Sequence, residues 1–147
     1  MDPTAPSDRL REAGLRRTPA RIAIFARVCA ADHPQSHAEL RLDPALEGID
    51  EITLYRTLST LEGSRLIHRV LGLDGVWRYS NNPVGTPGCP GNHAHFYCTG
   101  CGKMTCLVDQ PMSRILAPEG AAVEGRQMVA WGQCAACRCP PAKAESP

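Results

Sequence analysis

Apolar positions in the first third of the chain recur with helical spacing. Thr18 and Pro19 provide a cap and a first helical residue, and the apolar residues after them predict a helix with one buried side. A shorter helix is predicted before it over Ser7–Ala13, with the serine as its cap. Ser36 and Glu39 have the capping-box pattern, which predicts a third helix.

A fourth helix is predicted to begin between Asp50 and Thr53. Three leucines at i, i+4 and i+7 give it an apolar stripe that faces a core: Leu54, Leu58 and Leu61. Thr53 and Arg56 lie roughly opposite that stripe, so the helix also presents a polar face. Two β-like runs, Leu66–Leu71 and Val76–Ser80, follow around a short hairpin loop. Helices followed by a hairpin indicate a winged helix-turn-helix.

A segment rich in proline and glycine separates this region from the rest of the chain. Residues 82–92 hold three prolines and three glycines, which is typical of a linker. Beyond it we expect strands over 93–108 and 121–131, with a short helix over 111–116 between them. The chain after Cys139 has the composition of a disordered tail. These elements predict an α+β fold.

Composition favours a soluble intracellular protein. The 147 residues are 43% hydrophobic, no apolar run approaches the length of a membrane span, and the first residues lack a secretion signal. The formal net charge of +1 does not by itself indicate a nucleic-acid partner. The distribution is more informative, because residues 9–27 hold six arginines against one acidic residue. Such a block is a candidate basic face.

Eight cysteines in a reducing compartment favour metal binding over disulfides. Two Cys-x-x-Cys pairs have the spacing that lets a tight turn direct both sulfurs at one ion, namely Cys98 with Cys101 and Cys134 with Cys137. We expect these four thiolates to hold a structural zinc ion. Free or redox-active thiols are the alternative.

Two histidines lie just before the first of these pairs. His93 and His95 are two residues apart, so on a strand both imidazoles point to one face. Cys89 lies four residues earlier on a loop that can fold back, and the three side chains suggest a second metal ion. A closed site needs a fourth ligand, for which His68 and Cys106 are candidates. A closed site also argues against catalysis.

Other residues of these types have simpler interpretations. Cys29 is expected to be a small core residue, and His37 is expected to face solvent. Asn81 and Asn82 are poor metal ligands and are given no role in the site. The two tryptophans, Trp77 and Trp131, are expected to pack rather than to stack on bases.

Four motifs occur in the order of a known family: GLRRTPAR at 14–21, ITLYRTL at 52–58, His-x-His-x-x-Cys-x-x-Cys-Gly at 93–102 and Cys-x-x-Cys at 134–137. With them the chain resembles the ferric uptake regulator (Fur) family from about Leu10 to Arg138. The resemblance implies dimeric, metal-dependent DNA-binding repressors with an N-terminal winged helix and a C-terminal α/β dimerisation domain. It divides the chain into a winged-helix DNA-binding domain (1–81), a hinge (82–92), a dimerisation and metal-binding domain (93–139) and a tail (140–147).

Within that family the chain is most similar to the zinc uptake regulator (Zur) branch. The resemblance implies two zinc ions per subunit, the structural one and a regulatory one at the hinge, held by His68, Cys89, His93 and His95. Cys106 falls where some zinc sensors have a glutamate ligand, so it is an alternative to His68. Iron-sensing members have a glutamate after the aromatic residue of the wing, where this chain has Ser80.

The resemblance also implies a DNA-binding surface. Tyr55 and Arg56 match positions that contact DNA, and Thr53 is placed to reach a phosphate. Arg16 and Arg17 suit contacts with the DNA backbone, which position the protein without specifying sequence. Arginine can also bind guanine with two hydrogen bonds in the major groove.

The function expected from these features is a cytoplasmic, zinc-responsive repressor of zinc-uptake genes. It would bind palindromic operator DNA as a homodimer when the sensor zinc is present. We expect no enzymatic activity, no membrane association and no small-molecule substrate. The alternatives are an Fe²⁺- or Mn²⁺-responsive regulator of the same family and, less favoured, a thiol redox sensor.

Overall fold

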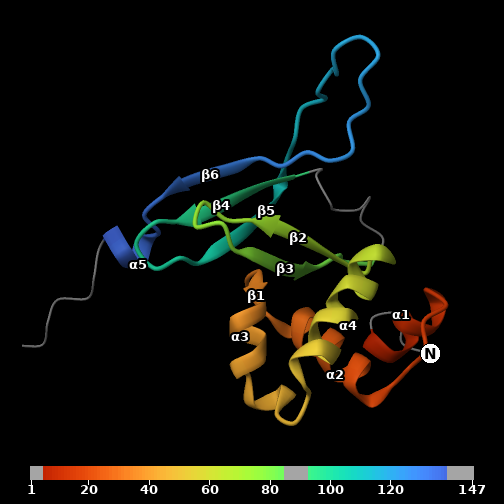
Figure 1. The fold of residues 1–147 in the computed structure, drawn as a ribbon. Helices are drawn as coiled ribbons and strands as arrows, with labels where there is room; N and C mark the ends of the chain where they lie inside the picture. The colour runs from red at the N-terminus through yellow and green to blue at the C-terminus, as the bar shows by residue number, and fades with distance from the viewer. Residues whose placement is uncertain (1–4, 85–92, 139–147) are drawn as a thin grey trace, which may run out of the picture.

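The structure is a computed structural model and describes residues 5–84 and 93–138 (Figure 1). Its N-terminal part contains the predicted helices and hairpin. The elements are α1 (Pro6–Glu12), α2 (Pro19–Ala30), β1 (Gln35–Ser36), α3 (His37–Leu42), a 3₁₀ turn (Pro44–Leu46), α4 (Glu51–Gly63), β2 (Ile67–Leu71) and β3 (Trp77–Asn81). The predicted tail (140–147), and Cys89 in the predicted hinge, lie outside the described residues.

Helix starts follow the local capping rules, with one exception. Thr18 accepts a hydrogen bond from the Arg21 N–H at the start of α2, and Ser36 forms the predicted capping box with Glu39. The predicted Ser7 cap of α1 is wrong. Ala5 takes the cap position without a side-chain hydrogen bond, because Pro6 begins the helix one residue earlier.

The helical core forms around the predicted leucine stripe. Leu54, Leu58 and Leu61 of α4 are buried against α1, α2 and α3. Phe25 on α2 is fully buried in the same cluster, and Tyr79 joins it from β3. The wing, which is the hairpin of β2 and β3, is therefore packed on the helices. Burial of the leucine stripe also determines which face of α4 points outward.

Two three-stranded sheets lie one above the other in Figure 1. The first has the order β1-β3-β2 and is antiparallel, with β2 at one edge. The second is formed by β4 (His93–Cys98), β5 (Met104–Pro111) and β6 (Val129–Gly132) in the order β5-β4-β6, with β6 parallel to β4. The short helix α5 (Ala135–Arg138) follows at the end of β6.

The chain between β5 and β6 differs from the prediction. Residues 112–128 contain neither the short helix expected over 111–116 nor a strand beginning at 121, and β6 covers only four residues. Most of these residues are exposed, and the segment projects away from both sheets in Figure 1. A short helix needs an apolar face packed on something, and this segment has no such support within the described chain.

The wing packs against the C-terminal sheet. Val70 of β2 lies in a small core with Tyr97 and Met104, and Val129 packs against it. The Arg78 guanidinium lies 5.3 Å from the centre of the Tyr97 ring. This contact brings β2 beneath β4 and creates the junction at which the candidate sensor residues meet. Within the described residues, no helix has the length and apolar character to cross a membrane.

Candidate metal centres and DNA-binding face

Four cysteine thiols meet at one end of the C-terminal sheet. Their sulfur atoms all lie within 4.8 Å of one another: Cys98, Cys101, Cys134 and Cys137. The first pair flanks the turn after β4, and the second lies at the start of α5. Gly100 allows this approach, because a Cβ at that position would lie 2.9 Å from Sγ of Cys137. The two Cys-x-x-Cys pairs therefore converge on one point, as the spacing predicts.

The protonation chemistry of this cluster suits a divalent cation. Backbone N–H groups of Cys134 and Cys101 lower the pKa of the Cys98 thiol to about 6. The neighbouring thiols of Cys134 and Cys98 raise the pKa of Cys137 to about 12. Four crowded thiols cannot all ionise unaided, and a bound cation supplies the compensating charge. Four sulfur donors fit tetrahedral zinc, which the cluster would hold as a structural ion.

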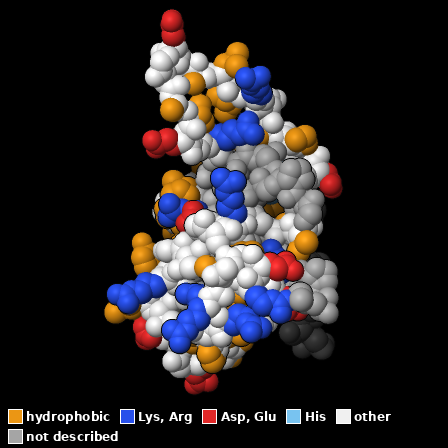
Figure 2. Space-filling model, turned by 90° about the vertical axis from the view of Figure 1, so that its right-hand side faces the viewer, with side chains coloured by type: hydrophobic (Ala, Val, Ile, Leu, Met, Phe, Trp, Pro, Cys, Tyr) orange, Lys and Arg blue, Asp and Glu red, His pale blue; other side chains and the backbone are white. Residues whose placement is uncertain are grey.

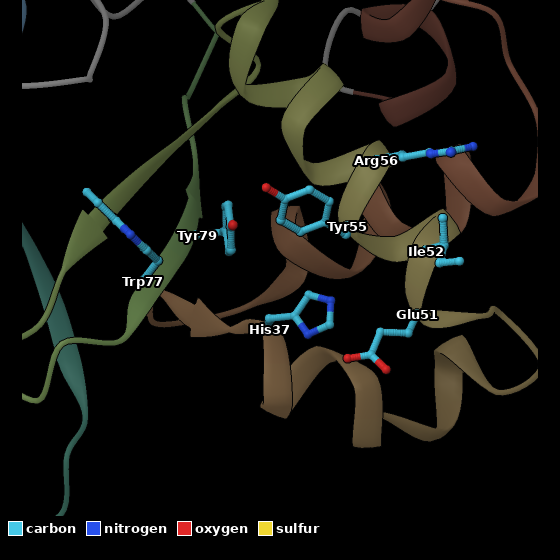
Figure 3. Close-up of a pocket in the computed structure, with 7 residues that line it drawn as sticks. All are labelled: His37, Glu51, Ile52, Tyr55, Arg56, Trp77 and Tyr79. Atoms are coloured by element: carbon cyan, nitrogen blue, oxygen red, sulfur yellow. The ribbon is translucent and has the colours of Figure 1, made fainter.

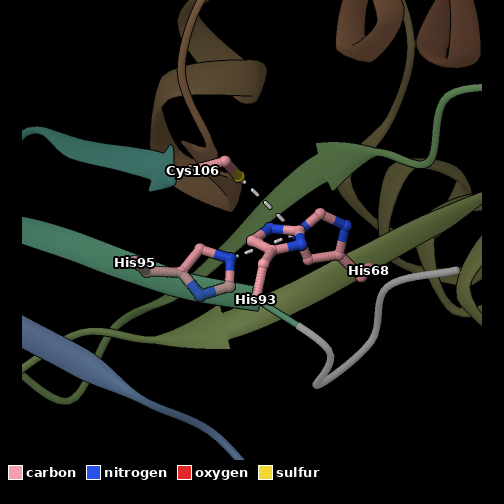
Figure 4. A group of neighbouring side chains, drawn as sticks. All are labelled: His68, His93, His95 and Cys106. Atoms are coloured by element: carbon pink, nitrogen blue, oxygen red, sulfur yellow. Dashed lines mark hydrogen bonds between the residues drawn. The ribbon is translucent and has the colours of Figure 1, made fainter. Parts of the chain in front are cut away.

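A second cluster lies at the junction between the wing and the C-terminal sheet (Figure 4). It joins His68 of β2, His93 and His95 of β4, and Cys106 of β5, all with potential ligand atoms within 4.8 Å of one another. The Nε2 atoms of His68 and His95 are 3.4 Å apart, and Sγ of Cys106 is 3.7 Å from Nε2 of His68. Strand register explains part of this, because His95 and Cys106 are cross-strand partners.

These distances match the requirements of a tetrahedral zinc ion. With Zn–N and Zn–S bonds of about 2.0–2.1 and 2.3 Å, two nitrogen ligands lie about 3.3 Å apart and a nitrogen and a sulfur about 3.6 Å apart. The Nδ1 atom of His95 is buried with no hydrogen-bond partner among the described residues. The atom of His95 that faces the cluster is Nε2, so the fit to zinc rests on the donor set and on the separations of these nitrogen and sulfur atoms.

Burial keeps these imidazoles neutral. It lowers the pKa of His68 to about 4, opposed by a hydrogen bond with Asn82, and lowers the pKa of His95 to about 3 with help from the other two histidines. Burial also lowers the pKa of His93. A neutral imidazole has a lone pair available for a metal, so these side chains need not lose a proton to bind one.

Cys106 lies in this cluster, where the sequence had left the identity of the fourth ligand open. It lies with His68, so the two candidates for the fourth ligand are neighbours rather than alternatives in space. Burial raises the pKa of the Cys106 thiol, and the Ser80 hydroxyl 3.6 Å away partly offsets this. The predicted ligand Cys89 lies outside the described residues, so its position relative to the cluster stays a prediction.

Polar contacts also cross the junction. The Gln127 side chain accepts a hydrogen bond from the Leu71 N–H at 2.9 Å and donates one to the Leu71 carbonyl at 2.7 Å. Leu71 ends β2 at the edge of its sheet, so this amide occupies a backbone position that a further strand would otherwise use. A further contact joins the C-terminal part to the helices, since Nζ of Lys103 lies 3.6 Å from the Asp32 carboxylate after α2.

The face of α4 opposite the leucine stripe is exposed. Tyr55 has 60% of its surface exposed, and Arg56 beside it is also exposed. Arg16 and Arg17 are exposed in the loop before α2, and Figure 2 shows Lys and Arg side chains gathered over the helical part of the molecule. Thr53 is different, because its hydroxyl donates a hydrogen bond to Asp50 at 2.6 Å within the helix cap.

A groove lies between α4 and the wing (Figure 3). Its volume is about 600 Å³, and its lining is mostly apolar: His37, Glu51, Ile52, Tyr55, Arg56, Trp77 and Tyr79. The expectation that His37 faces solvent is wrong in part, because the residue is half-buried and its Nε2 has no partner among the described residues. The expectation that both tryptophans pack is met only in part, because Trp77 is 39% exposed with the Arg69 guanidinium 4.3 Å from the centre of its ring. For Trp131 it is wrong within this chain, since 65% of that residue is exposed.

Residues 12–129 match the ferric uptake regulator family. The matched residues include the α4 face and His68, His93, His95 and Cys106. The chain belongs to this family. It is a Fur-family transcriptional regulator, as the motifs predict, and its fold combines a winged helix with a C-terminal α/β part.

Known proteins similar to this Fur-family chain include both iron- and zinc-named regulators. It is 28% identical over 138 residues to the transcriptional regulator FurA of Mycobacterium tuberculosis, covering 89% of this chain and 88% of the relative. Its fold is similar to that of a zinc uptake regulator complexed with zinc and DNA, with a TM-score of 0.61, 21% identity and 89% coverage of each chain. It is also similar to the Vibrio cholerae ferric uptake regulator, with a TM-score of 0.59, 19% identity, and coverage of 87% and 98%.

Sequence reasoning missed two kinds of residue in this regulator. Glu51 and Ile52 of α4 line the groove beside Tyr55, and their place at the predicted helix start was a signal that could have found them. Asn82 was given no role, yet it is buried and bonded to His68. No local pattern shows that contact, because it joins residues 14 positions apart across a hairpin.

Proposed function

We propose that this protein is a zinc-responsive repressor, with a structural zinc on the four cysteines and a regulatory zinc on the cluster at the junction. The observation that carries the proposal is the composition and place of that second cluster. It combines imidazoles with one thiol, is buried, and draws ligands from both the wing and the C-terminal sheet.

The donor set favours zinc over iron or manganese. Imidazole and thiolate ligands suit zinc, whereas manganese is better matched by carboxylate oxygens. No Asp or Glu belongs to either cluster within the described residues. Ser80 lies beside Cys106, where the resemblance places a glutamate in iron-sensing members. The similarity to ferric uptake regulators keeps Fe²⁺ as the second candidate inducer.

Zinc would act by selecting one orientation of the wing. His68 belongs to the wing, whereas His93, His95 and Cys106 belong to the C-terminal sheet. One ion can therefore bind all four only when the wing packs against this sheet as in the structure, which we call the docked state. A ligand shifts such an equilibrium only by its differential affinity for the two states. A shift from about 1% to about 99% docked requires about 5.5 kcal/mol of such difference.

In the docked state, the exposed face of α4 would be held in the orientation that binds the operator. Arg56 is suited to a bidentate contact with guanine and Tyr55 to packing on a thymine methyl group. Arg16 and Arg17 are suited to phosphate contacts. Thr53 is a weaker candidate than the sequence indicates, since its hydroxyl already bonds Asp50. The similarity to a zinc uptake regulator bound to zinc and DNA supports this assignment.

The operator would be bound by a homodimer in the cytoplasm. The C-terminal part leaves large apolar side chains uncovered, including Trp131 of β6 with 65% of its surface exposed and Leu116 of the segment between β5 and β6 with 78%. A second copy of the chain would cover them, and a two-fold dimer would match a palindromic operator. With the domain boundaries proposed at 81 and 93, this surface would belong to the dimerisation domain and the groove to the DNA-binding domain.

A thiol redox sensor is less well supported. Burial raises the pKa of the Cys106 thiol, which lowers the fraction of reactive thiolate. The four remaining described cysteines of the C-terminal part are committed to the sulfur cluster.

The test is operator binding measured against buffered metal. Duplexes are selected from a random library with the zinc-loaded protein, and affinity is then measured at controlled free Zn²⁺, Fe²⁺ and Mn²⁺. We expect binding to require zinc at free concentrations far below those of the other two metals, and to weaken with salt. Equal activation of operator binding by Fe²⁺ at its ordinary cellular level would mean that the inducer is iron and not zinc. The absence of any salt-dependent duplex binding would reject the DNA-binding function.

A further inference from the structure

Asn82 is bonded through all of its polar groups. Its side-chain oxygen lies 2.7 Å from Nδ1 of His68, and its side-chain nitrogen donates to the Arg65 carbonyl at 2.8 Å. Its backbone N–H bonds the Leu66 carbonyl at 3.0 Å, and its carbonyl accepts from the Arg9 guanidinium at 2.5 Å. A residue held at four points presents its amide oxygen in a fixed direction.

That direction determines which nitrogen of His68 carries the proton. Because the amide NH₂ is committed to the Arg65 carbonyl, the atom facing His68 is the amide oxygen, which can only accept. Nδ1 of His68 must therefore be the protonated nitrogen of the neutral ring. The lone pair is then on Nε2, the atom that lies 3.4 Å from His95 and 3.7 Å from Cys106.

We propose that Asn82 is a positioning residue that holds His68 in the Nδ1–H tautomer, with Nε2 ready to bind the regulatory zinc. A partner on the second nitrogen of a ligating histidine commonly fixes ring orientation and raises metal affinity. The proposal rests on the regulatory role of the cluster given above. Asn82 is a poor metal ligand itself, and its function would be to orient a residue that binds the metal.

Arg9 extends this arrangement to the helical part of the molecule. Its guanidinium also donates to the Asn81 side chain at 2.7 Å and lies 4.7 Å from the centre of the Phe25 ring. Helix α1, the core residue Phe25 and the segment after β3 are therefore joined by one buried side chain. Arg9 and Asn82 thus hold the His68 ring in position from the helical side of the junction. Zinc would therefore bind a ligand that is already oriented.

The test compares Asn82→Ala with Asn81→Ala as the matched control. Asn81 is the adjacent residue of the same type and bonds Arg9, but its side chain makes no hydrogen bond to His68 in the described structure. Long-range ¹H–¹⁵N spectra of protein loaded only at the cysteine site report the tautomer of His68. Zinc affinity of the second site is measured by competition with a chromophoric chelator.

We expect wild type and Asn81→Ala to show the Nδ1–H tautomer, and Asn82→Ala to show a mixture and to bind zinc 10–100-fold more weakly. Asn82→Asp keeps an acceptor towards Nδ1 of His68 but loses the donor to the Arg65 carbonyl. It should therefore retain the tautomer and bind zinc more tightly than Asn82→Ala, which separates this role from general loss of folding. An Nε2–H tautomer in wild type overturns the proposal, as does an Asn82→Ala affinity within twofold of wild type. If wild type binds zinc as expected but never responds with DNA binding, the repressor function fails while the tautomer result stands.

Discussion

The two candidate metal centres differ in what brings their ligands together. The four cysteines all belong to the C-terminal part and lie on turns that the sheet and α5 hold in place, where three of the four are at least partly exposed. The second cluster is buried and exists only where the wing meets the sheet. The first can therefore bind metal whatever the wing does, whereas the second cannot.

This difference separates a structural centre from a regulatory one on physical grounds. An ion bound within one folded part changes the stability of that part but does not affect how it is oriented relative to the wing. An ion shared between two parts is linked to their orientation by necessity, because its affinity differs between docked and undocked states. Each of the following experiments asks whether one centre acts locally and the other across the junction.

The largest effect is expected from the cysteine cluster. Cys134→Ser removes one of four ligands of a site whose metal contributes directly to folding, so the free energy of unfolding of the C-terminal part should fall by several kcal/mol. Chemical denaturation followed by circular dichroism measures this. Cys29→Ser is the control, because Cys29 packs beside the helical core outside both clusters. Equal losses in the two variants would contradict a structural metal.

The second largest effect is expected at the junction. His95→Ala removes a buried ligand candidate, so the second zinc should bind at least 100-fold more weakly while the first remains, and the metal content should fall from two ions to one per subunit. Metal analysis after dialysis at fixed free zinc measures this. His33→Ala is the control, since His33 contacts Asp32 outside the cluster. Loss of both ions from His95→Ala would mean that the centres are not independent.

Local patterns predicted the parts of this molecule that depend on near neighbours. The caps at Thr18 and Ser36, the leucine stripe of α4 and the two Cys-x-x-Cys pairs all follow from spacings of three to seven residues, and the structure has them. The hairpin of β2 and β3 follows in the same way from two short apolar runs around a turn.

The remainder depends on contacts that spacing does not encode. Whether Pro111–Leu116 forms a helix depends on a surface for it to pack on, and the described chain offers none. Cys106 joins the second cluster because register places it opposite His95. Asn82 matters through the direction of its amide, which is set by Arg65 and Arg9 from other elements. Sequence therefore predicted the metal-binding residue types at the junction, but not the support that orients them.

A pH dependence should separate a docked from an undocked junction when the second metal is absent. Burial lowers the pKa of His68 to about 4 in the docked protein, against about 6.5 for an exposed imidazole, so below pH 6.5 the unfolded chain binds a proton that the folded one does not. Stability is therefore fully present above pH 6.5 and is lost as pH falls towards 4, by about 2 kcal/mol between pH 7 and pH 5.

The measurement is urea denaturation at both pH values of protein loaded only at the cysteine site, compared with His68→Gln. The variant has no titrating group at this position, so wild type should lose about 2 kcal/mol more than the variant does. Identical losses would show that His68 is solvated without its metal, which places the wing in the undocked state before zinc binds.

The smallest effect concerns the contact between the wing edge and the C-terminal sheet. Gln127→Ala removes both hydrogen bonds to Leu71, each with a net contribution of about 0.5–1.5 kcal/mol, and these bonds exist only in the docked state. Both bonds are exposed, so the low end of this range applies and together they contribute about 1 kcal/mol. Because metal binding requires docking, the zinc affinity of the second site should fall about fivefold while the cysteine site is unchanged. Gln110→Ala is the control, since Gln110 is exposed on β5 and its side chain makes no hydrogen bond to another described residue. Gln127→Glu should weaken binding further, because a carboxylate oxygen in place of the amide NH₂ would repel the Leu71 carbonyl. If Gln127→Ala instead lowered the affinity of both centres equally, the amide would support the sheet as a whole, and the distinction between a local and a junctional centre would lose its physical basis.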